Sequence, residues 1–156
     1  MNVTETIRQR YSVRGFRPDP VPESIIREVI DVARLAPSAS NTQPWHVAIV
    51  SGEARRRLQA AILEEIDAGK APYPGFPPGG AGLQGDYKRR QYACAFGYYG
   101  TMGIARDDLD ARRVLGRKNW EFFGAPHAAF LSMPGTMNRG NALDVGIFMQ
   151  SIMLLF

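Results

Sequence analysis

The stretch Ala36-Pro37-Ser38-Ala39-Ser40-Asn41-Thr42-Gln43-Pro44-Trp45 combines two prolines, three hydroxyl side chains, two amides and an indole. It separates a helix-like apolar pattern from a run of β-branched residues, so we expect an ordered loop there. Pro37 cannot continue the preceding helix, and Pro44 fixes φ just before the next strand. Asn41 and Gln43 therefore project from a stiff frame. Amide side chains both donate and accept hydrogen bonds, which suits the polar edge of a flat heterocycle.

A second stretch, Arg10-Tyr11-Ser12-Val13-Arg14-Gly15-Phe16, is basic. If it is extended, its period of two places Arg10, Ser12 and Arg14 on one face. Two guanidinium groups with a hydroxyl between them are suited to binding phosphate. The stretch therefore predicts a phosphate site, and the alternative is that the arginines are ordinary exposed surface charge.

Together the two stretches resemble the FMN-dependent nitroreductase family, whose members open with a basic-Ser-basic segment and later carry a Pro-Ser-x-x-Asn-x-Gln-Pro-Trp loop. The resemblance extends from Ile7 to about Leu155. It implies an α+β fold, a three-layer α/β/α sandwich, with residues 1–156 forming one domain. It also implies that NAD(P)H reduces bound FMN and that nitroaromatics, quinones or related acceptors then take the electrons in a ping-pong reaction.

The same resemblance assigns the cofactor contacts. Arg10 and Arg14 are expected at the FMN phosphate and ribityl region, with Tyr11 and Ser12 beside them. The loop is expected to contact the flavin of a neighbouring subunit, so that the active form is a homodimer; its contact residues are Pro37, Ser38, Ala39, Asn41 and Gln43, of which Gln43 supports the loop or the ring edge. The alternative for the loop is a rigid turn that merely precedes a strand.

Apolar periodicity and turn residues predict the order of the other elements. We expect Thr4, Asp107 and Asn141 to cap helices and Pro22 to stand near the first turn of another. The expected helices cover residues 4–9, about 22–36, 53–68, 85 or 86 to 102, 106 to about 120 and 141–156, and the expected strands cover residues 46–50 and 128–133. The helix at 53–68 is expected to point Leu58, Ala61, Ile62 and Ile66 inward, and strand 46–50 is expected to be buried.

Residues 70–85 are rich in proline and glycine and cannot form regular structure. A loop of this length is either a lid or disordered, and the sequence leaves both open. In the helix that follows, the resemblance implies that Tyr92, Phe96 and Tyr99 border the substrate, and the alternative is ordinary core packing.

The end of the chain is a nearly all-apolar helix without a capping residue, and two strands make a marginal sheet. Family members continue beyond this point with further strands. We therefore expect a truncated chain whose sheet is incomplete and whose last helix is buried in a core or between subunits.

Composition narrows the classes of protein. With 156 residues and 45% hydrophobic content, the chain can form a real core. The net charge of +4 is dispersed, and the runs at 55–57 and 88–90 are either solvated helix faces or a patch for phosphate or nucleic acid. The single Cys94 excludes an internal disulfide framework, fits a reducing compartment and is expected to be buried. Neither a signal peptide nor a membrane span is indicated, so we expect a cytoplasmic protein.

No protein catalyst stands out. His46 and His127 are expected to be structural, and neither a nucleophile–base pair nor a metal set is present. A flavoenzyme needs neither, because the cofactor carries the electrons. Two other classes stay open: an inactive fragment that only associates through its last helix, and a nucleic-acid-binding module supported by basic charge alone. The physiological substrate and the choice between NADH and NADPH also stay open.

Overall fold

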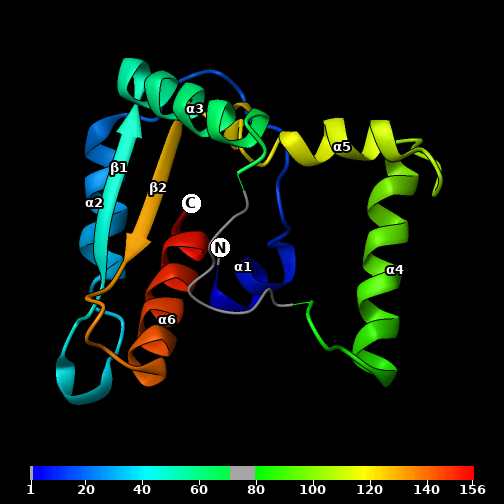
Figure 1. Ribbon diagram of the computed structural model, residues 1–156. Coiled ribbons are helices and arrows are strands. Elements are labelled where there is room, and N and C mark those ends of the chain that lie inside the picture. The colour runs from blue at the N-terminus through cyan, green and yellow to red at the C-terminus, as the bar shows by residue number, and fades with distance from the viewer. Residues whose placement is uncertain (1, 71–79) are drawn as a thin grey trace. The chain divides into compact units, whose positions relative to one another are not determined.

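The computed structural model describes residues 2–70 and 80–156 (Figure 1). Most of the stretch predicted to be a lid or disordered lies outside the described residues. In chain order the elements are α1 (Val3–Gln9), α2 (Glu23–Ala33), η1 (Ala39–Asn41), β1 (His46–Ser51), α3 (Gly52–Asp67), α4 (Gly85–Thr101), α5 (Leu109–Arg117), η2 (Phe122–Gly124), β2 (His127–Ser132) and α6 (Arg139–Leu155). The chain divides into two compact units, Met1–Leu58 with Gly124–Phe156, and Gln59–Phe123.

The first unit is built on an antiparallel pair of strands. β1 pairs with β2 so that His46 lies opposite Ser132 and Ser51 lies opposite His127. The β-branched residues of β1 favour the extended backbone. Both predicted strands are confirmed, and each begins or ends within one residue of its expected limit.

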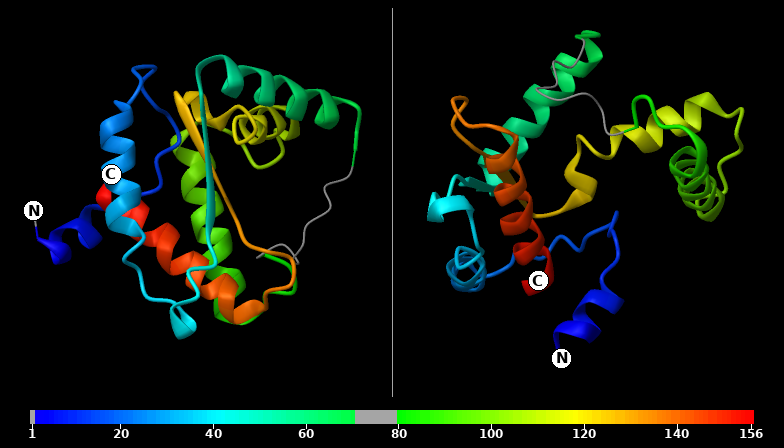
Figure 2. Two further views of the ribbon diagram at one scale, coloured as in Figure 1. Left: turned by 90° about the vertical axis from the view of Figure 1, so that its left-hand side faces the viewer. Right: turned by 90° about the horizontal axis from the view of Figure 1, so that it is seen from below.

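Two helices accompany the strands in this unit. α2 packs against α6, and α6 also contacts β2 (Figure 2). α2 buries Ile26, Val29 and Ala33, the helical spacing that the sequence predicts. Phe148 of α6 is completely buried. The core of the first unit therefore lies mainly at the contact between α2 and α6.

Burial is less extensive than the sequence predicts. Ile49 of the strand expected to be buried is 38% exposed, and on α6 only Asp144 and Phe148 are buried. Leu143 of that helix is 67% exposed. The reason is that the sheet of the described residues has two strands, which cover too little area to enclose the apolar faces around them.

Helix ends also differ from expectation. In α1, α5 and α6 the capping residue is an Asn or Asp just before the first helical residue, and its side chain accepts a backbone N–H from the first turn. α5 ends at Arg117 rather than near residue 120. The observed caps are Asn2 instead of Thr4, Asp108 instead of Asp107, and Asn138 instead of Asn141.

The second unit contains the end of α3 with α4 and α5. On α3, Ile62 and Ile66 are half-buried, as is Leu58 at the edge of the first unit, but Ala61 is exposed, contrary to the prediction. Cys94 on α4 is exposed as well, so its expected burial is wrong. On α5, Leu115 is buried.

An ion pair links α3 to α5 in this unit. Arg117 Nη2 donates to Asp67 Oδ2 at 2.9 Å, and Arg117 Nη1 donates to Asp67 Oδ1. The hydrogen bonds from Arg117 hold the pKa of Asp67 below its ordinary value, and the same bonds raise the pKa of Arg117.

Candidate functional site

The basic N-terminal segment follows α1 directly. The N–H of Arg10 donates to the carbonyl of Thr6, and the φ of −60° and ψ of 129° at Arg10 turn the chain out of the helix. From there residues 10–16 run without helix or strand hydrogen bonding. The predicted end of the first helix at Gln9, directly before the basic segment, is therefore confirmed.

This segment lines an apolar hollow of about 760 Å³ in the first unit. Arg10, Tyr11 and Ser12 are among its lining residues, whereas Arg14 is exposed and does not line it. The end of α6 supplies another wall through Ile152, Met153, Leu154 and Phe156. The structure thus brings three of the four predicted N-terminal site residues to one hollow.

The chemistry of the hollow suits an amphipathic ligand. Its walls are mainly aliphatic and aromatic, while Arg10 and Ser12 provide a guanidinium group and a hydroxyl. Ligand pockets in proteins commonly enclose about 300–1,000 Å³, so this hollow can hold a molecule with a ring system. A flat ring with a phosphate-bearing tail matches this combination, because guanidinium groups bind phosphate strongly.

The proline-framed loop is held by its own hydrogen bonds. Ser38 Oγ accepts the N–H of Gln43 at 2.9 Å, and Gln43 Nε2 donates to Asn41 Oδ1 at 3.2 Å. Ser40, Asn41 and Gln43 have φ of 51°, 55° and 46°, the left-handed region that non-glycine residues seldom occupy. Such conformations persist only where the surroundings enforce them. Gln43 therefore supports the loop, one of the two roles considered for it.

α6 anchors this loop near both ends. Asp144 Oδ2 accepts the N–H of Ala39 at 3.3 Å. One turn further along α6, Phe148 stacks on Trp45 with the ring centroids 4.7 Å apart and the planes 5° from parallel. Asp144 was not among the residues predicted for the site, although it is the one carboxylate of this mainly apolar helix.

The hollow and the loop lie at different ends of α6. The hollow uses residues from Ile152 onward, while the loop contacts Asp144 and Phe148. At a rise of 1.5 Å per residue, Asp144 and Leu154 are about 15 Å apart along the helix. Figures 1 and 2 show α1 beside the end of α6 and the loop before β1 beside its start. One chain therefore does not bring the two predicted half-sites together.

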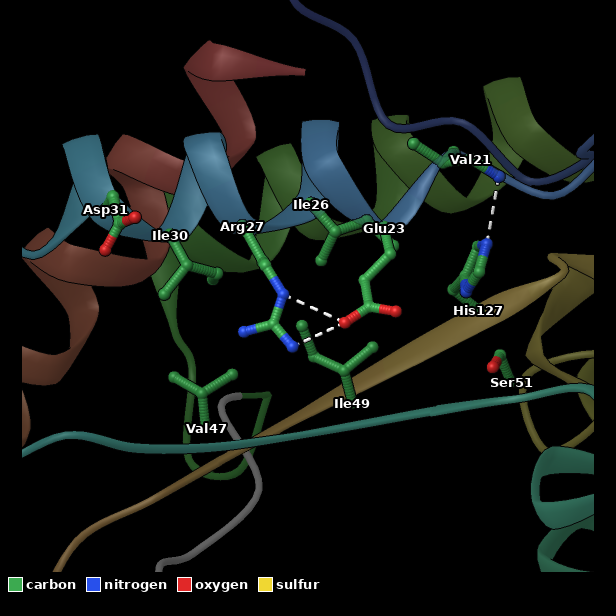
Figure 3. A pocket seen from close by; sticks show the side chains of 10 residues that line it. All are labelled: Val21, Glu23, Ile26, Arg27, Ile30, Asp31, Val47, Ile49, Ser51 and His127. Atoms are coloured by element: carbon green, nitrogen blue, oxygen red, sulfur yellow. Dashed lines mark hydrogen bonds and ion pairs between the residues drawn. The ribbon is translucent and has the colours of Figure 1, made fainter.

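A second hollow of about 560 Å³ lies between α2 and β1 (Figure 3). At its edge the N–H of Val21 donates to His127 Nε2 at 2.9 Å, which confirms the structural role predicted for this histidine. Glu23 and Arg27 form an ion pair across one turn of α2. Because the backbone occupies His127 Nε2, this nitrogen is not placed to act as a base on a ligand.

The three aromatic residues predicted to bind substrate lie on α4 in the second unit. Tyr92, Phe96 and Tyr99 share one face of the helix, since they are four and three residues apart. Tyr92 and Phe96 are 51% and 57% exposed, so they are not core residues of this unit. A cation covers each ring at 4.4–5.8 Å from its centroid: Lys88 over Tyr92, Arg106 over Phe96 and Arg112 over Tyr99.

The two basic runs contain exposed ion pairs. Arg56 pairs with Glu53 on α3, and Arg89 pairs with Asp86 on α4. These pairs favour solvated helix faces over a patch for polyanions. Across residues 2–70 and 80–156, none of the helices has the length and apolar character needed to cross a membrane.

A family model, "Nitroreductase family", matches residues 7–156. The chain belongs to the nitroreductase family. The family expected from the two motifs is thus confirmed, and with it the α+β nitroreductase-like fold. In a comparison of solved structures, the FMN-dependent nitroreductase NfnB from Mycobacterium smegmatis, in complex with NADPH, superposes with a TM-score of 0.92 at 39% identity, over 97% of this chain and 68% of that chain.

Two sequence relatives of this nitroreductase-family chain are named after nitroaromatic reduction. Nitroreductase NfnB of Mycolicibacterium smegmatis is 41% identical over 148 residues, which cover 95% of this chain and 63% of NfnB. The 4-nitrobenzoate reductase of Pseudomonas putida is 36% identical over 150 residues, 95% of this chain and 64% of that protein. The chain therefore spans less than two thirds of the length of these relatives.

Proposed function

We propose that this nitroreductase-family chain acts in an FMN-dependent oxidoreductase that takes electrons from NAD(P)H and reduces nitroaromatics, quinones or related acceptors in a ping-pong reaction. The observation that carries the proposal is the apolar hollow lined by Arg10 and Ser12. Support comes from relatives named as FMN- and NADPH-dependent nitroreductases and as nitrobenzoate reductases. The proposal treats residues 1–156 as one domain to which both compact units belong.

Each predicted residue has a role in this proposal. Arg10 and Ser12 bind the phosphate-bearing part of FMN within the hollow, and Tyr11 packs against the tail of the cofactor. Arg14, which lies outside the hollow, adds positive charge toward the phosphate from the solvent side. Bound FMN supplies the two-electron chemistry. The acceptor stacks on the aromatic residues of α4, namely Tyr92, Phe96 and Tyr99.

The loop residues complete the site from a second chain. Pro37, Ser38, Ala39 and Asn41 contact the flavin held by the partner subunit, and Gln43 supports their loop. They serve the partner's site because α6 separates them from Arg10 in their own chain. The exposed apolar residues of α6, among them Leu143 and Met149, provide a surface for the homodimer. A twofold interface creates two equivalent sites. We also propose a cytoplasmic location, on the basis of the single cysteine.

A visible spectrum and an NAD(P)H oxidation assay test the proposal. The purified protein is expected to be yellow, and NAD(P)H is expected to be consumed when a nitroaromatic is added. Arg10→Ala is expected to weaken FMN binding at least about tenfold, since it removes a charge-assisted contact. Arg8→Ala is the matched control, because Arg8 is an exposed cation of α1 outside the hollow. A protein that stays colourless with excess FMN would contradict the proposal.

A second candidate function follows from the exposed apolar side chains of α6. On that alternative the chain is an inactive family member that only associates with copies of itself or another chain. It would form dimers in sedimentation experiments without showing a flavin peak. The same absorbance scan therefore separates the two functions.

A further inference from the structure

We infer that Asp144 is a positioning residue, which fixes the conformation of the loop that faces the partner's flavin. The inference rests on the proposed function, because it assigns a task to a side chain that supports this site. In the proposed site Asp144 contacts neither FMN nor the electron acceptor. It acts through Ala39 and Asn41.

The burial of Asp144 needs an explanation. Among the residues that the structure describes, Asp144 is the one polar or charged residue that is buried, with 7% of its surface exposed. Burying a carboxylate is unfavourable unless hydrogen bonds compensate for the loss of water. Its neighbours along α6 are mostly apolar, and an apolar side chain at this position would avoid that cost. The carboxylate is therefore present for its directional contact with the N–H of Ala39, at 3.3 Å.

The contact with Ala39 acts where the loop takes its unusual shape. Ala39 begins η1, and Ser40 and Asn41, which follow, have left-handed φ values. After these residues, the N–H of Gln43 donates to Ser38 Oγ, which holds the following part of the loop. Asn41 is therefore enclosed between two fixed hydrogen bonds. Losing the one at Ala39 would release the strained residues toward more common conformations.

The neighbouring anchor cannot replace this hydrogen bond. Phe148, four residues after Asp144, stacks on Trp45 at the other end of the loop. Stacking fixes the position of Trp45 but exerts no directional hold on the backbone at Ala39. Asp144 and Phe148 together are the two buried residues of α6, and both are used to hold this loop.

The test compares Asp144→Ala with the conservative Asp144→Asn in the whole protein. FMN affinity is measured by quenching of flavin fluorescence, and exchange of the Ala39 amide is measured by NMR without FMN. We expect Asp144→Ala to weaken FMN binding about tenfold and to speed Ala39 exchange by a similar factor, as for a lost hydrogen bond to a charged group. Asp144→Asn keeps an acceptor oxygen, so it is expected to retain affinity within about threefold.

Two controls separate positioning from loss of stability. Val29→Ala removes buried volume from α2 in the same unit, so it should lower stability without changing FMN affinity. The amide of Val21, bonded to His127, should exchange equally fast in Asp144→Ala and in the parent. If the parent binds FMN but Asp144→Ala binds it equally well, or if Val29→Ala loses as much affinity, the inference is wrong. If the parent itself does not bind FMN, the proposed function fails instead, and Ala39 exchange still reports on the contact.

Discussion

Phe148 is the largest side chain that the described part of the core encloses completely. Its ring lies parallel to that of Trp45, so it joins α6 to the residue that links the loop to β1. Stacked aromatic pairs contribute beyond the area that they bury. Phe148 thus supports both the core of the first unit and the end of the proline-framed loop at Trp45.

Phe148→Ala is therefore expected to lower the free energy of unfolding by about 3–5 kcal/mol, the range for deleting a buried phenylalanine. Phe148→Leu, which fills most of the volume, should cost clearly less. Urea unfolding followed by tryptophan fluorescence measures both, and the emission of Trp45 should shift to longer wavelength in the alanine variant. Equal unfolding midpoints for the two variants would show that the ring does not hold the core in this way.

At the residue scale, three of the residues predicted from the sequence line the hollow, but the residue that supports the loop was not predicted. The hydroxyl, amide and guanidinium groups of the two stretches carry recognisable chemistry, and Arg10, Tyr11 and Ser12 indeed line one hollow. The sequence marks Asp144 as the one carboxylate of its helix, but it does not identify the partner of that carboxylate, which is 105 positions away in the chain. Only the packing of α6 beside the loop reveals that contact.

At the scale of elements, the order and type of the helices and strands were predictable, whereas the helix caps were not. Every predicted helix and strand in the described residues is present. The caps at Asp108 and Asn138 were missed because Asp and Asn also occur nearby, at 107 and 141. Asp or Asn at either position is an equally suitable cap in the sequence. Which of the two side chains accepts the first N–H depends on the backbone angles, which the sequence does not distinguish.

The pair formed by Asp67 and Arg117 connects two helices of the second unit. Asp67 is the last residue of α3, where the helix dipole disfavours a negative charge. Arg117, the last residue of α5, offsets this by donating two hydrogen bonds to the carboxylate. The pair is therefore a direct contact between the end of α3 and the end of α5.

This pair makes stability depend on pH in a definite direction. Because the hydrogen bonds from Arg117 lower the pKa of Asp67 in the folded state, its contribution is complete above the ordinary value of 3.8 and is lost as the pH falls through the lower folded value. Asp67→Asn should therefore reduce the melting temperature at neutral pH but not well below pH 3.8. Melting temperatures of the parent and of Asp67→Asn, measured from neutral pH to well below pH 3.8, test this prediction. Asp110→Asn, which alters an exposed pair on α5, is the control.

At the scale of the whole molecule, the fold class followed from the two motifs, but the extent of burial did not. Leu143 and Ile49 look like core residues in the sequence and are exposed in the chain alone. Apolar patterning says that a face will be covered but not by which chain. Burial was therefore overestimated where the two-stranded sheet of the described residues leaves an apolar face exposed.

The placement of Arg10 and Asn41 beside opposite ends of α6 predicts complementation between variants. Arg10→Ala and Asn41→Ala are each expected to lose FMN when pure. When the two are mixed and allowed to exchange subunits, each mixed dimer should contain one intact site, so about a quarter of all sites should regain FMN after random pairing. Flavin absorbance after gel filtration measures the recovery. No recovery would mean that each site is built within one chain.

The apolar side of α6 has a further consequence for handling the protein. If holding the ring requires two chains, cofactor retention obeys mass action, and association of the chains and uptake of FMN reinforce each other. A concentrated stock would then keep its yellow colour through gel filtration, whereas the same stock, once diluted below the dimer dissociation constant, would shed fluorescent free flavin. Added FMN would in turn protect the dilute protein against falling apart into single chains.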